Sequence, residues 1–569
     1  MIQPFMAAAA QFEVGINKEA NLEKTLHFIG EAAQKGADLV VLPEFLNHCS
    51  WYQDQAHCFE VSVALEDPFI SAIKEKAKDH GLYVVANVTL RRDHGKVTGT
   101  SLLVDPSGGI ISMTDKQVLI GHENDFLTAS QKPSKVVDTA LGRIGTYACM
   151  DGVLFETPRA LALQGAQVLC NSLNSFARCE GDLHIPVRAA ENKLFVVAAN
   201  KVGPLIPVEQ VKAVSKAINI PADALNGAGD SQVVGPDGSI LAKADQSSEM
   251  VITAMVDPNL ADAKHRPDGT SLFVHRRPEL YKPITQAPQK VNSSLSKAAP
   301  EVEVAIYQPK FKDIRAIDEV VDIIKNAEDY SILTLPALFC IDSKTVEDLP
   351  KSKIVSDTAI TEMTKALREK DGLLVASSLI LEQERGYQHC GVMLDKNGVK
   401  AVQPQLHLPP APKPALQPGL DLTVFETPFG KAALVVGQDT LYPETFRLAA
   451  IKGAHFVLSP FDAQESWELQ YGLAERSAEN RLCIVAASHE TDFGASLFAT
   501  LQADYTIMTK WENRPFDGNI SAPILKRTKN KPGLYRGTIH PERSNNKLLS
   551  HRTHVVNSRP WHILDGMIS

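Results

Sequence analysis

The sequence predicts two consecutive copies of one layered α/β domain, each built on a mixed β-sheet. Apolar runs of strand length alternate with amphipathic stretches of helix length, a pattern typical of α/β folds. Turn signals rich in glycine, proline and aspartate, at residues 105–109 and 235–238, predict antiparallel hairpins in the same sheets. The motifs of the first half of the chain return in the same order after residue 300, which indicates a tandem repeat.

The first copy begins with a β-α-β pattern. Residues 6–14 look like a strand, and residues 17–35 carry apolar side chains near helical spacing and stop at Gly36. Residues 37–42 form the next apolar run. The remaining elements that we expect are a helix at 69–80, strands at 82–88 and 144–148, a hairpin at 101–112, a helix from 156, a strand at 168–171, a helix at 186–193, and strands at 194–200 and 250–256.

Residues 285–300 separate the two copies. This segment is polar, contains two prolines and three serines, and has no apolar periodicity, which is typical of a linker. We therefore predict a first domain at 1–284, a linker at 285–300 and a second domain at 301–569.

Composition restricts the class of protein. The formal net charge is −9, with 22% charged and 44% hydrophobic residues, which predicts a globular protein without nucleic acid or an anionic membrane as partner. No apolar run is long enough for a membrane helix, and the amino-terminal stretch lacks the basic region of a signal peptide. Eight cysteines without regular spacing favour reduced thiols and a cytoplasmic location.

One stretch of the first copy has the pattern of a nucleophile turn. The apolar run 144–148 predicts a buried strand, residues 149–152 interrupt it, and a helical pattern follows. At such a turn the Cys149 sulfur would lie at the carboxyl end of the strand, where backbone N–H groups and the helix dipole favour a thiolate. A lone cysteine is as often a packed apolar residue, so the assignment depends on its partners.

Two further stretches supply a carboxylate and a cation. The apolar strand 39–42 leads to Glu44, and Lys116 follows the hairpin at 101–112. A Glu after LVVLP, a Lys after a DPxG hairpin and a Cys before xDxxxxE together resemble the nitrilase superfamily of carbon–nitrogen hydrolases. The resemblance covers nearly all of residues 1–284.

The resemblance implies a four-layer αββα sandwich, present twice in tandem, and a role for each polar residue. Cys149 would be the nucleophile, Glu44 the general base, and Lys116 and the backbone N–H of Met150 the donors that stabilise the oxyanion. We also expect Lys116 to lower the pKa of Cys149. Glu123, seven positions after Lys116, matches a second glutamate that orients the lysine and the substrate in many members; the alternative is a surface carboxylate. The chemistry needs no metal and no organic cofactor.

The second copy keeps the scaffold and lacks the reacting groups. At the offsets that we assign, Ala337 stands at the position of the base, Gln405 at that of the lysine and Gln438 at that of the cysteine. A methyl group or an amide cannot attack a carbonyl or transfer protons near neutral pH. We therefore expect a pseudoenzyme domain that packs against the first domain as a dimer partner would, through a surface that is apolar on both copies.

Other polar residues have two interpretations each. Trp51, in the loop after the base, and Asn174, after a strand end, are candidates for substrate contact, although asparagine is also common in turns. Residues 188–192, which return as 476–480, predict a structural network on a helix.

Three further patterns do not indicate sites. The His-Cys pairs at 48–49 and 57–58 lack the spacing of zinc ligands, and Gly227 and Gly229 fit no phosphate-binding loop. The lysines and arginines after residue 525 predict a solvated arm that wraps a partner, in preference to a nucleic-acid contact.

These residues predict a hydrolase that cleaves a non-peptide C–N bond in a small linear amide or N-carbamoyl amine through a cysteine thioester. Asp151 after the nucleophile and the RRPxLY segment ending at Tyr281 resemble the amidase and carbamoylase branches, whereas the nitrilase branch resembles C-W-E. Three alternatives remain: a nitrilase acting on a small nitrile, an acyl- or amidotransferase, and a non-enzymatic scaffold. The intrachain pseudo-dimer could form a further homo-oligomer.

Overall fold

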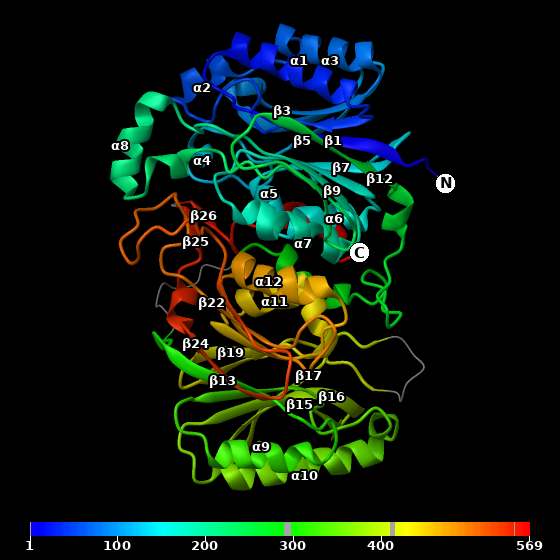
Figure 1. The fold of residues 1–569 in the computed structure, drawn as a ribbon, viewed down its shortest axis with the longest axis vertical. Coiled ribbons are helices and arrows are strands. Elements are labelled where there is room, and N and C mark those ends of the chain that lie inside the picture. The colour runs from blue at the N-terminus through cyan, green and yellow to red at the C-terminus, as the bar shows by residue number, and fades with distance from the viewer. Residues whose placement is uncertain (1, 289–296, 410–415, 551) are drawn as a thin grey trace.

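The computed structural model describes residues 2–288, 297–409, 416–550 and 552–569. Each half of the chain contains two six-stranded mixed sheets, which pack face to face and carry helices on their outer faces (Figure 1). The predicted four-layer αββα arrangement, present twice, is confirmed. Most of the predicted linker, residues 289–296, lies outside the described residues.

The outer sheet of the first half has the strand order β12-β1-β2-β3-β4-β5. Its strands are β1 (Phe5–Gln11), β2 (Leu39–Val41), β3 (Tyr83–Arg91), β4 (Val97–Val104), β5 (Ile110–Asp115) and β12 (Met250–Val256). An apolar cluster that includes Phe28, Ile73 and Val84 joins this sheet to the two helices that cover it. These helices are α1 (Lys18–Gln34) and α3 (Pro68–His80), and the short α2 (Gln55–Val61) lies between them in the chain.

The inner sheet of the first half has the order β11-β10-β9-β8-β7-β6. Its strands are β6 (Val137–Thr139), β7 (Gly142–Ala148), β8 (Val168–Ser172), β9 (Phe195–Ala199), β10 (Gln232–Val234) and β11 (Ile240–Lys243). The helices of this part are α4 (Glu123–Phe126), α5 (Met150–Val153), α6 (Glu156–Leu163), α7 (Ile185–Asn192) and α8 (Val208–Ile218).

The second half repeats these layers. One sheet contains β13 (Val302–Gln308), β14 (Ile332–Ala337), β15 (Leu374–Gln383), β16 (Gly386–Asp395), β17 (Gly398–Pro404) and β24 (Gly533–Ile539). The other contains β18 (Val424–Thr427), β19 (Gly430–Leu434), β20 (Phe456–Pro460), β21 (Cys483–Ala487), β22 (Leu497–Thr500) and β23 (Ile524–Arg527). The helices are α9 (Ala316–Lys325), α10 (Leu349–Leu367), α11 (Pro443–Ile451) and α12 (Leu473–Asn480), and β25 (Leu548–Ser550) pairs with β26 (Thr553–His554).

Local sequence signals explain the element ends that were predicted. Asn17 caps α1, since its side chain accepts a hydrogen bond from the Ala20 N–H at 2.8 Å. Gly81 ends α3 with φ +66°, a conformation that costs a glycine little. No helix among the described residues is long and apolar enough to cross a membrane.

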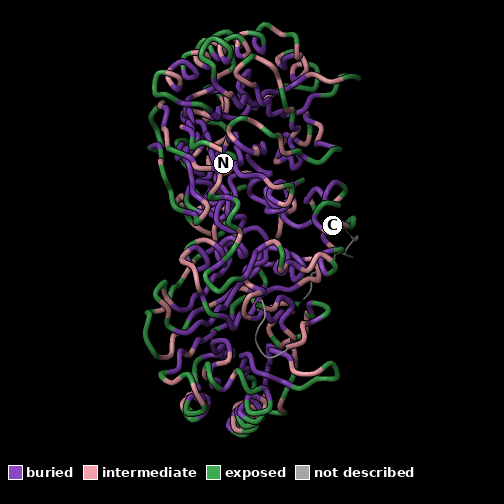
Figure 2. Tube along the Cα trace, turned by 90° about the vertical axis from the view of Figure 1, so that its right-hand side faces the viewer, coloured by how far each residue is buried: buried purple, intermediate pink, exposed green. Residues whose placement is uncertain are grey.

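The two halves meet through their inner helices, α6 and α7 on one side and α11 and α12 on the other (Figure 1). Green, exposed segments gather on the outer helices at both ends of the molecule, whereas the junction is mainly buried (Figure 2). An apolar cluster that includes Leu154, Phe155, Phe446 and Leu473 spans the junction.

Buried ion pairs also cross the junction. Arg159 Nε lies 2.9 Å from Glu444 Oε1, and Arg447 Nε lies 2.7 Å from Glu156 Oε1. The two pairs exchange equivalent positions of the repeat, as expected for a pseudo-twofold interface. Intrachain pairing is thus confirmed, but the prediction of an apolar surface is wrong in part. Charged groups on the inner helices are buried there because each has a partner of opposite sign in the other half.

The structure corrects one position of the repeat. Gly142 and Gly430 open equivalent strands, both with positive φ, so the offset in this region is 288 (430 − 142). Cys149, with φ +46°, then corresponds to Gly437, with φ +53°, and not to Gln438. The choice between Gly437 and Gln438 decides which side chain occupies the position of the nucleophile, because a shift of one residue in a strand moves every side chain to the other face.

The basic carboxy-terminal region is not a free arm, although its side chains, among them Lys526, Lys529 and Arg536, are exposed to solvent as predicted. Its first part forms β23 and β24, one in each sheet of the second half. Farther on, the half-buried Lys547 donates to the backbone oxygens of Asn480 and Arg481 at 2.9 and 3.0 Å. The region also wraps a partner, as predicted, but this partner is the first half of the same chain, which Ser550 and Thr553 contact.

Candidate active site

Glu44, Lys116 and Cys149 come together at the strand ends of the first half. Glu44 follows β2, Lys116 follows β5 and Cys149 follows β7. Lys116 Nζ donates to Glu44 Oε1 at 2.8 Å and to Glu123 Oε1 at 2.9 Å. Cys149 is close enough to these three residues to interact with their charges, and all four residues are buried. The structure thus brings together the four side chains that the sequence singled out.

The backbone at Cys149 is held in an unusual conformation. Its φ and ψ are +46° and −107°, and its N–H donates to Ser172 O and Asn171 Oδ1, each at 3.0 Å. A Cβ at Gly152 would lie 2.7 Å from the Tyr147 ring, so the turn after the cysteine requires glycine. Strain of this kind is typical of functional sites and persists only where the surroundings impose it.

Asp151 links the turn at residues 149–152 (the cysteine turn) to the loop at residues 116–123 (the lysine loop). Its Oδ1 accepts hydrogen bonds from the backbone N–H groups of Gln117 at 3.0 Å and Val118 at 2.7 Å. Glu123 Oε2 accepts one from the Ile120 N–H at 3.0 Å, which closes the same loop. The position of the Lys116 ammonium is therefore set from both sides.

Burial dominates the electrostatics of the site. It raises the pKa of Glu44 to about 7, although the adjacent Lys116 acts in the opposite direction. Burial, with the nearby Glu44 charge, also raises the pKa of the Cys149 thiol well above its ordinary value. Lys116 lowers this pKa, as predicted, but burial and the Glu44 charge outweigh the cation, so the net shift of the Cys149 pKa is upward. A buried thiol beside a carboxylate with a pKa near neutrality needs that carboxylate to take its proton.

Two polar residues near the triad were not predicted from the sequence. Lys201 follows β9 and Glu180 follows β8 by a short loop, and both are buried. Among the described residues, no hydrogen-bond partner is present for Lys201 Nζ or for Glu180 Oε2. In the sequence, the only sign of these two residues is that each follows a strand that is parallel to β7. This position does not show that they lie near Cys149 unless the strand order is known.

The two weaker candidates lie in different surroundings. Asn174 follows β8, and its buried Oδ1 has no hydrogen-bond partner in the described part of the chain. The half-buried Trp51 packs edge-on against His122, with ring centroids 6.0 Å apart, beside the loop that carries Glu123. Asn174 therefore has an unused acceptor, whereas Trp51 supports the lysine loop.

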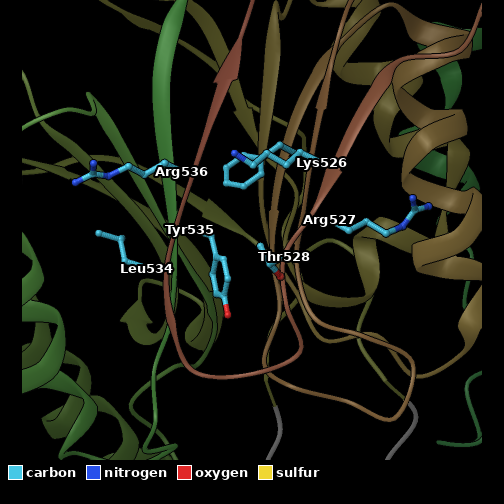
Figure 3. A pocket seen from close by; sticks show the side chains of 7 residues that line it. Lys526, Arg527, Thr528, Leu534, Tyr535 and Arg536 are labelled. Carbon is cyan, nitrogen blue, oxygen red and sulfur yellow. The ribbon is translucent and has the colours of Figure 1, made fainter.

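A cavity of about 480 Å³ lies in the second half, remote from Cys149 in the chain, and is lined by Lys526, Arg527 and Arg536 (Figure 3). The two arginines point away from each other and already have partners: Arg536 pairs with Asp329 at 3.0 Å, and Arg527 donates to Leu469 O at 3.1 Å. These cations do not converge on one ligand. Within the described ranges, no group of three His, Cys, Asp or Glu residues is arranged to hold a metal ion.

Comparison with known proteins agrees with this geometry. Residues 6–266 match the family model described as carbon-nitrogen hydrolase. These residues belong to the nitrilase superfamily of carbon–nitrogen hydrolases. The match spans both sheets of the first half and includes Glu44, Lys116 and Cys149.

Several curated hydrolases are similar to this half. A nitrilase from Pyrococcus abyssi is 28% identical over 267 residues, covering 47% of this chain and 94% of the relative. An omega-amidase from Xenopus laevis is 29% identical over 266 residues (44% and 88%), and the N-carbamoylputrescine amidase of Arabidopsis thaliana is 26% identical over 293 residues (49% and 94%). Among solved structures, a mutant amidase from Nesterenkonia has a TM-score of 0.39 and 21% identity, covering 45% of this chain and 93% of its own.

Proposed function

We propose that the first half hydrolyses a small linear amide or N-carbamoyl amine through a thioester on Cys149. The observation that carries the proposal is the Lys116 ammonium, which binds Glu44 and Glu123 at once beside a strained cysteine turn. A buried carboxylate that remains able to accept a proton, next to a thiol and a fixed cation, is suited to acyl transfer.

The chemistry follows from the free atoms of the site. Glu44 Oε2 is buried and has no hydrogen-bond partner in the described structure, so it can take the Cys149 proton as sulfur attacks the amide carbon. The Lys116 ammonium and the Met150 N–H, at the start of α5, would stabilise the oxyanion. Protonated Glu44 then gives its proton to the leaving nitrogen, which departs as amine or ammonia. Glu44 next removes a proton from water, which attacks the thioester and releases the acid and the thiol.

The choice of an amide depends on the relatives and on Asp151. The similar proteins are named nitrilase, omega-amidase and N-carbamoylputrescine amidase. Two of these names indicate hydrolysis of an amide or carbamoyl C–N bond, and the third indicates hydrolysis of a nitrile. Asp151 follows the nucleophile by two positions, as in the amidase and carbamoylase branches. A nitrilase and an acyl- or amidotransferase stay as alternatives, because both would use the same acyl-enzyme.

We further propose that the second half is a pseudoenzyme domain that supports the site. Ala337, Gln405 and Gly437 occupy the positions of the base, the lysine and the cysteine, and none of them can do acyl transfer. For Gln405 the register comes from Asp439, which accepts from the next two backbone N–H groups as Asp151 does in the first half.

Two contacts carry the support from the second half. Arg188 donates to the backbone oxygens of Gly152 and Val153, in the turn after Cys149, at 2.8 and 2.9 Å. The same guanidinium is held by Glu475 at 2.5 Å and Glu479 at 2.7 Å from the second half. The predicted structural network of residues 188–192 is therefore confirmed as part of the junction.

The other contact reaches the lysine loop. Ser550 Oγ accepts a hydrogen bond from the Gly121 N–H at 2.9 Å, and Thr553 Oγ1 donates to Leu119 O at 3.0 Å. These bonds fix the segment directly before Glu123. The second half thus touches both loops that place the proposed reacting groups.

An assay of ammonia or amine release tests the proposed reaction. Wild type and Cys149→Ala would be given matched amides, N-carbamoyl amines and nitriles of equal chain length. We expect turnover of amides or carbamoyl amines by the wild type alone, with an unchanged melting temperature for the variant. Nitrile turnover well above that of the matched amides would assign the nitrilase alternative, and activity retained in Cys149→Ala would reject the nucleophile.

A further inference from the structure

Lys201 is the most unusual charged residue near the site. It lies two residues after the end of β9, and it is only 1% exposed. In the part of the chain that the structure describes, no atom accepts a hydrogen bond from its Nζ. A buried ammonium without a partner opposes folding, so such a group is retained only where it has another use.

The ammonium lies close to the proposed reacting groups. Lys201 Nζ is 6.0 Å from the centre of the Phe45 ring, and Lys116 Nζ is 5.4 Å from the same point. The two nitrogens are therefore at most 11.4 Å apart, the sum of these distances. Glu44 does not neutralise Lys201, because the hydrogen bond of its carboxylate goes to Lys116.

The backbone at Lys201 is fixed by its neighbours. Its N–H donates to Asn200 Oδ1 at 2.9 Å, and its carbonyl accepts from the Gly229 N–H at 3.0 Å. A Cβ at Gly227 would lie 2.3 Å from the Lys201 oxygen, so only glycine allows this approach. Gly227 and Gly229, which fit no phosphate-binding loop, therefore have a structural role: they hold the backbone of Lys201 in place.

The charge of Lys201 persists at neutral pH. Burial lowers its pKa to about 8, while the acidic groups of Cys49, Glu44 and Cys149 act in the opposite direction. At pH 7 most molecules therefore carry an ammonium at this position.

We propose that Lys201 binds a carboxylate on the substrate, so that the substrates are short amides or N-carbamoyl amines that carry an acidic group at the far end. This inference rests on the proposed function, because it assumes that the scissile carbonyl oxygen faces Lys116. A second cation within 11.4 Å of Lys116 would then bind the carboxylate of a short acyl chain. It would also exclude a substrate whose far end is an amine, since like charges repel inside a low-dielectric site.

Three amides of similar length test the proposal: succinamate, neutral butanamide and cationic 4-aminobutanamide. For the wild type we expect kcat/KM to be about 10- to 100-fold higher for succinamate than for butanamide, the usual effect of a hydrogen bond to a charged group. It should be lowest for 4-aminobutanamide. In Lys201→Met the ratio of kcat/KM for succinamate to that for butanamide should fall to about one, and Lys201→Arg should restore most of the preference.

Binding provides a readout that does not need turnover. Calorimetry on the Cys149→Ala variant should show succinamate bound more tightly than butanamide, and adding Lys201→Met should remove the difference. If no amide is hydrolysed but this difference is found, the proposed function fails and the carboxylate site stands. Equal kcat/KM for the three amides, or equal loss for all three in Lys201→Met, would overturn the role of Lys201 and leave amide hydrolysis intact.

Stability separates this role from a structural one. Removal of an unpaired buried charge should leave the melting temperature of Lys201→Met equal to or above that of the wild type. Lys547→Met is the matched control, because Lys547 donates to two backbone oxygens and its loss should lower the melting temperature without changing substrate preference. A large fall in the melting temperature of Lys201→Met would overturn the proposal.

Discussion

Glu444→Gln tests whether the ion pairs of the junction hold the two halves together. Glu444 is fully buried, and its carboxylate accepts from Arg159 at 2.9 Å and from Arg276 at 3.2 Å. Its pKa is lowered to about 2, because these two arginines outweigh the effect of burial. The substitution keeps the shape of the side chain and leaves both guanidinium groups buried without a carboxylate.

Two routes give similar magnitudes for the loss of stability. Breaking a buried pair by removing one partner costs about 3–5 kcal/mol. A pKa lowered from 4.5 to about 2 corresponds to roughly 3 kcal/mol of folding free energy at neutral pH. We therefore expect Glu444→Gln to lower the free energy of unfolding by about 3 kcal/mol at pH 7, as measured by urea denaturation.

The sign of the pH dependence provides a second check. Because the folded pKa lies below the unfolded one, this contribution is complete above about pH 4.5 and is lost as the pH falls toward about 2. The difference between wild type and Glu444→Gln should therefore be constant from pH 7 to 5 and shrink below that. The control is Glu426→Gln, since Glu426 is exposed and lies 3.6 Å from Lys431. A change for Glu444→Gln as small as that of the control would refute the reasoning.

Three further outcomes follow from the site. The kcat/KM for a neutral amide should fall as the pH drops below about 7, because protonated Glu44 cannot accept the thiol proton. The titratable groups that face Glu44 are Lys116, Glu123, Lys201 and Cys149. A flat pH–rate profile between pH 6 and 8 would contradict that role for the base. Thr553→Val should lower kcat several-fold with little change in melting temperature, by releasing the lysine loop, and wild-type kcat would argue against support from the second half. Gln438→Ala should leave the rate unchanged, and a slower rate in that variant would mean that the second half takes part in catalysis.

The fold was predictable where local signals are strong. The cap at Asn17, the glycine at Gly81 and the alternation of short apolar runs with helical stretches indicated the elements to within a few residues. Glu44, Lys116 and Cys149 were found because each follows a recognisable strand. The three side chains are buried together because of the order of the strands in the sheets, and local sequence signals do not predict this order.

What could not be predicted depends on long-range packing. Lys201 looks like an ordinary surface lysine until β9 is placed beside β8 and its ammonium is found to have no hydrogen-bond partner among the described residues. In the sequence, the charged residues of α6 and α11 look like residues of a solvent-exposed helix face. They are buried in the structure because each is neutralised by a residue of the other half of the chain. The match of Cys149 to Gly437 required the strand register, since the two copies differ in loop length by single residues.

Trapping of the acyl-enzyme tests the central claim most directly. The protein would be mixed with an excess of an amide substrate, quenched in acid within the first turnovers and analysed by mass spectrometry after digestion. We predict a mass increase equal to the acyl group on the peptide that contains Cys149, accompanied by released ammonia or amine and absent in Glu44→Gln. Product formation without any adduct in the wild type, or an adduct on another of the eight cysteines, would contradict the account.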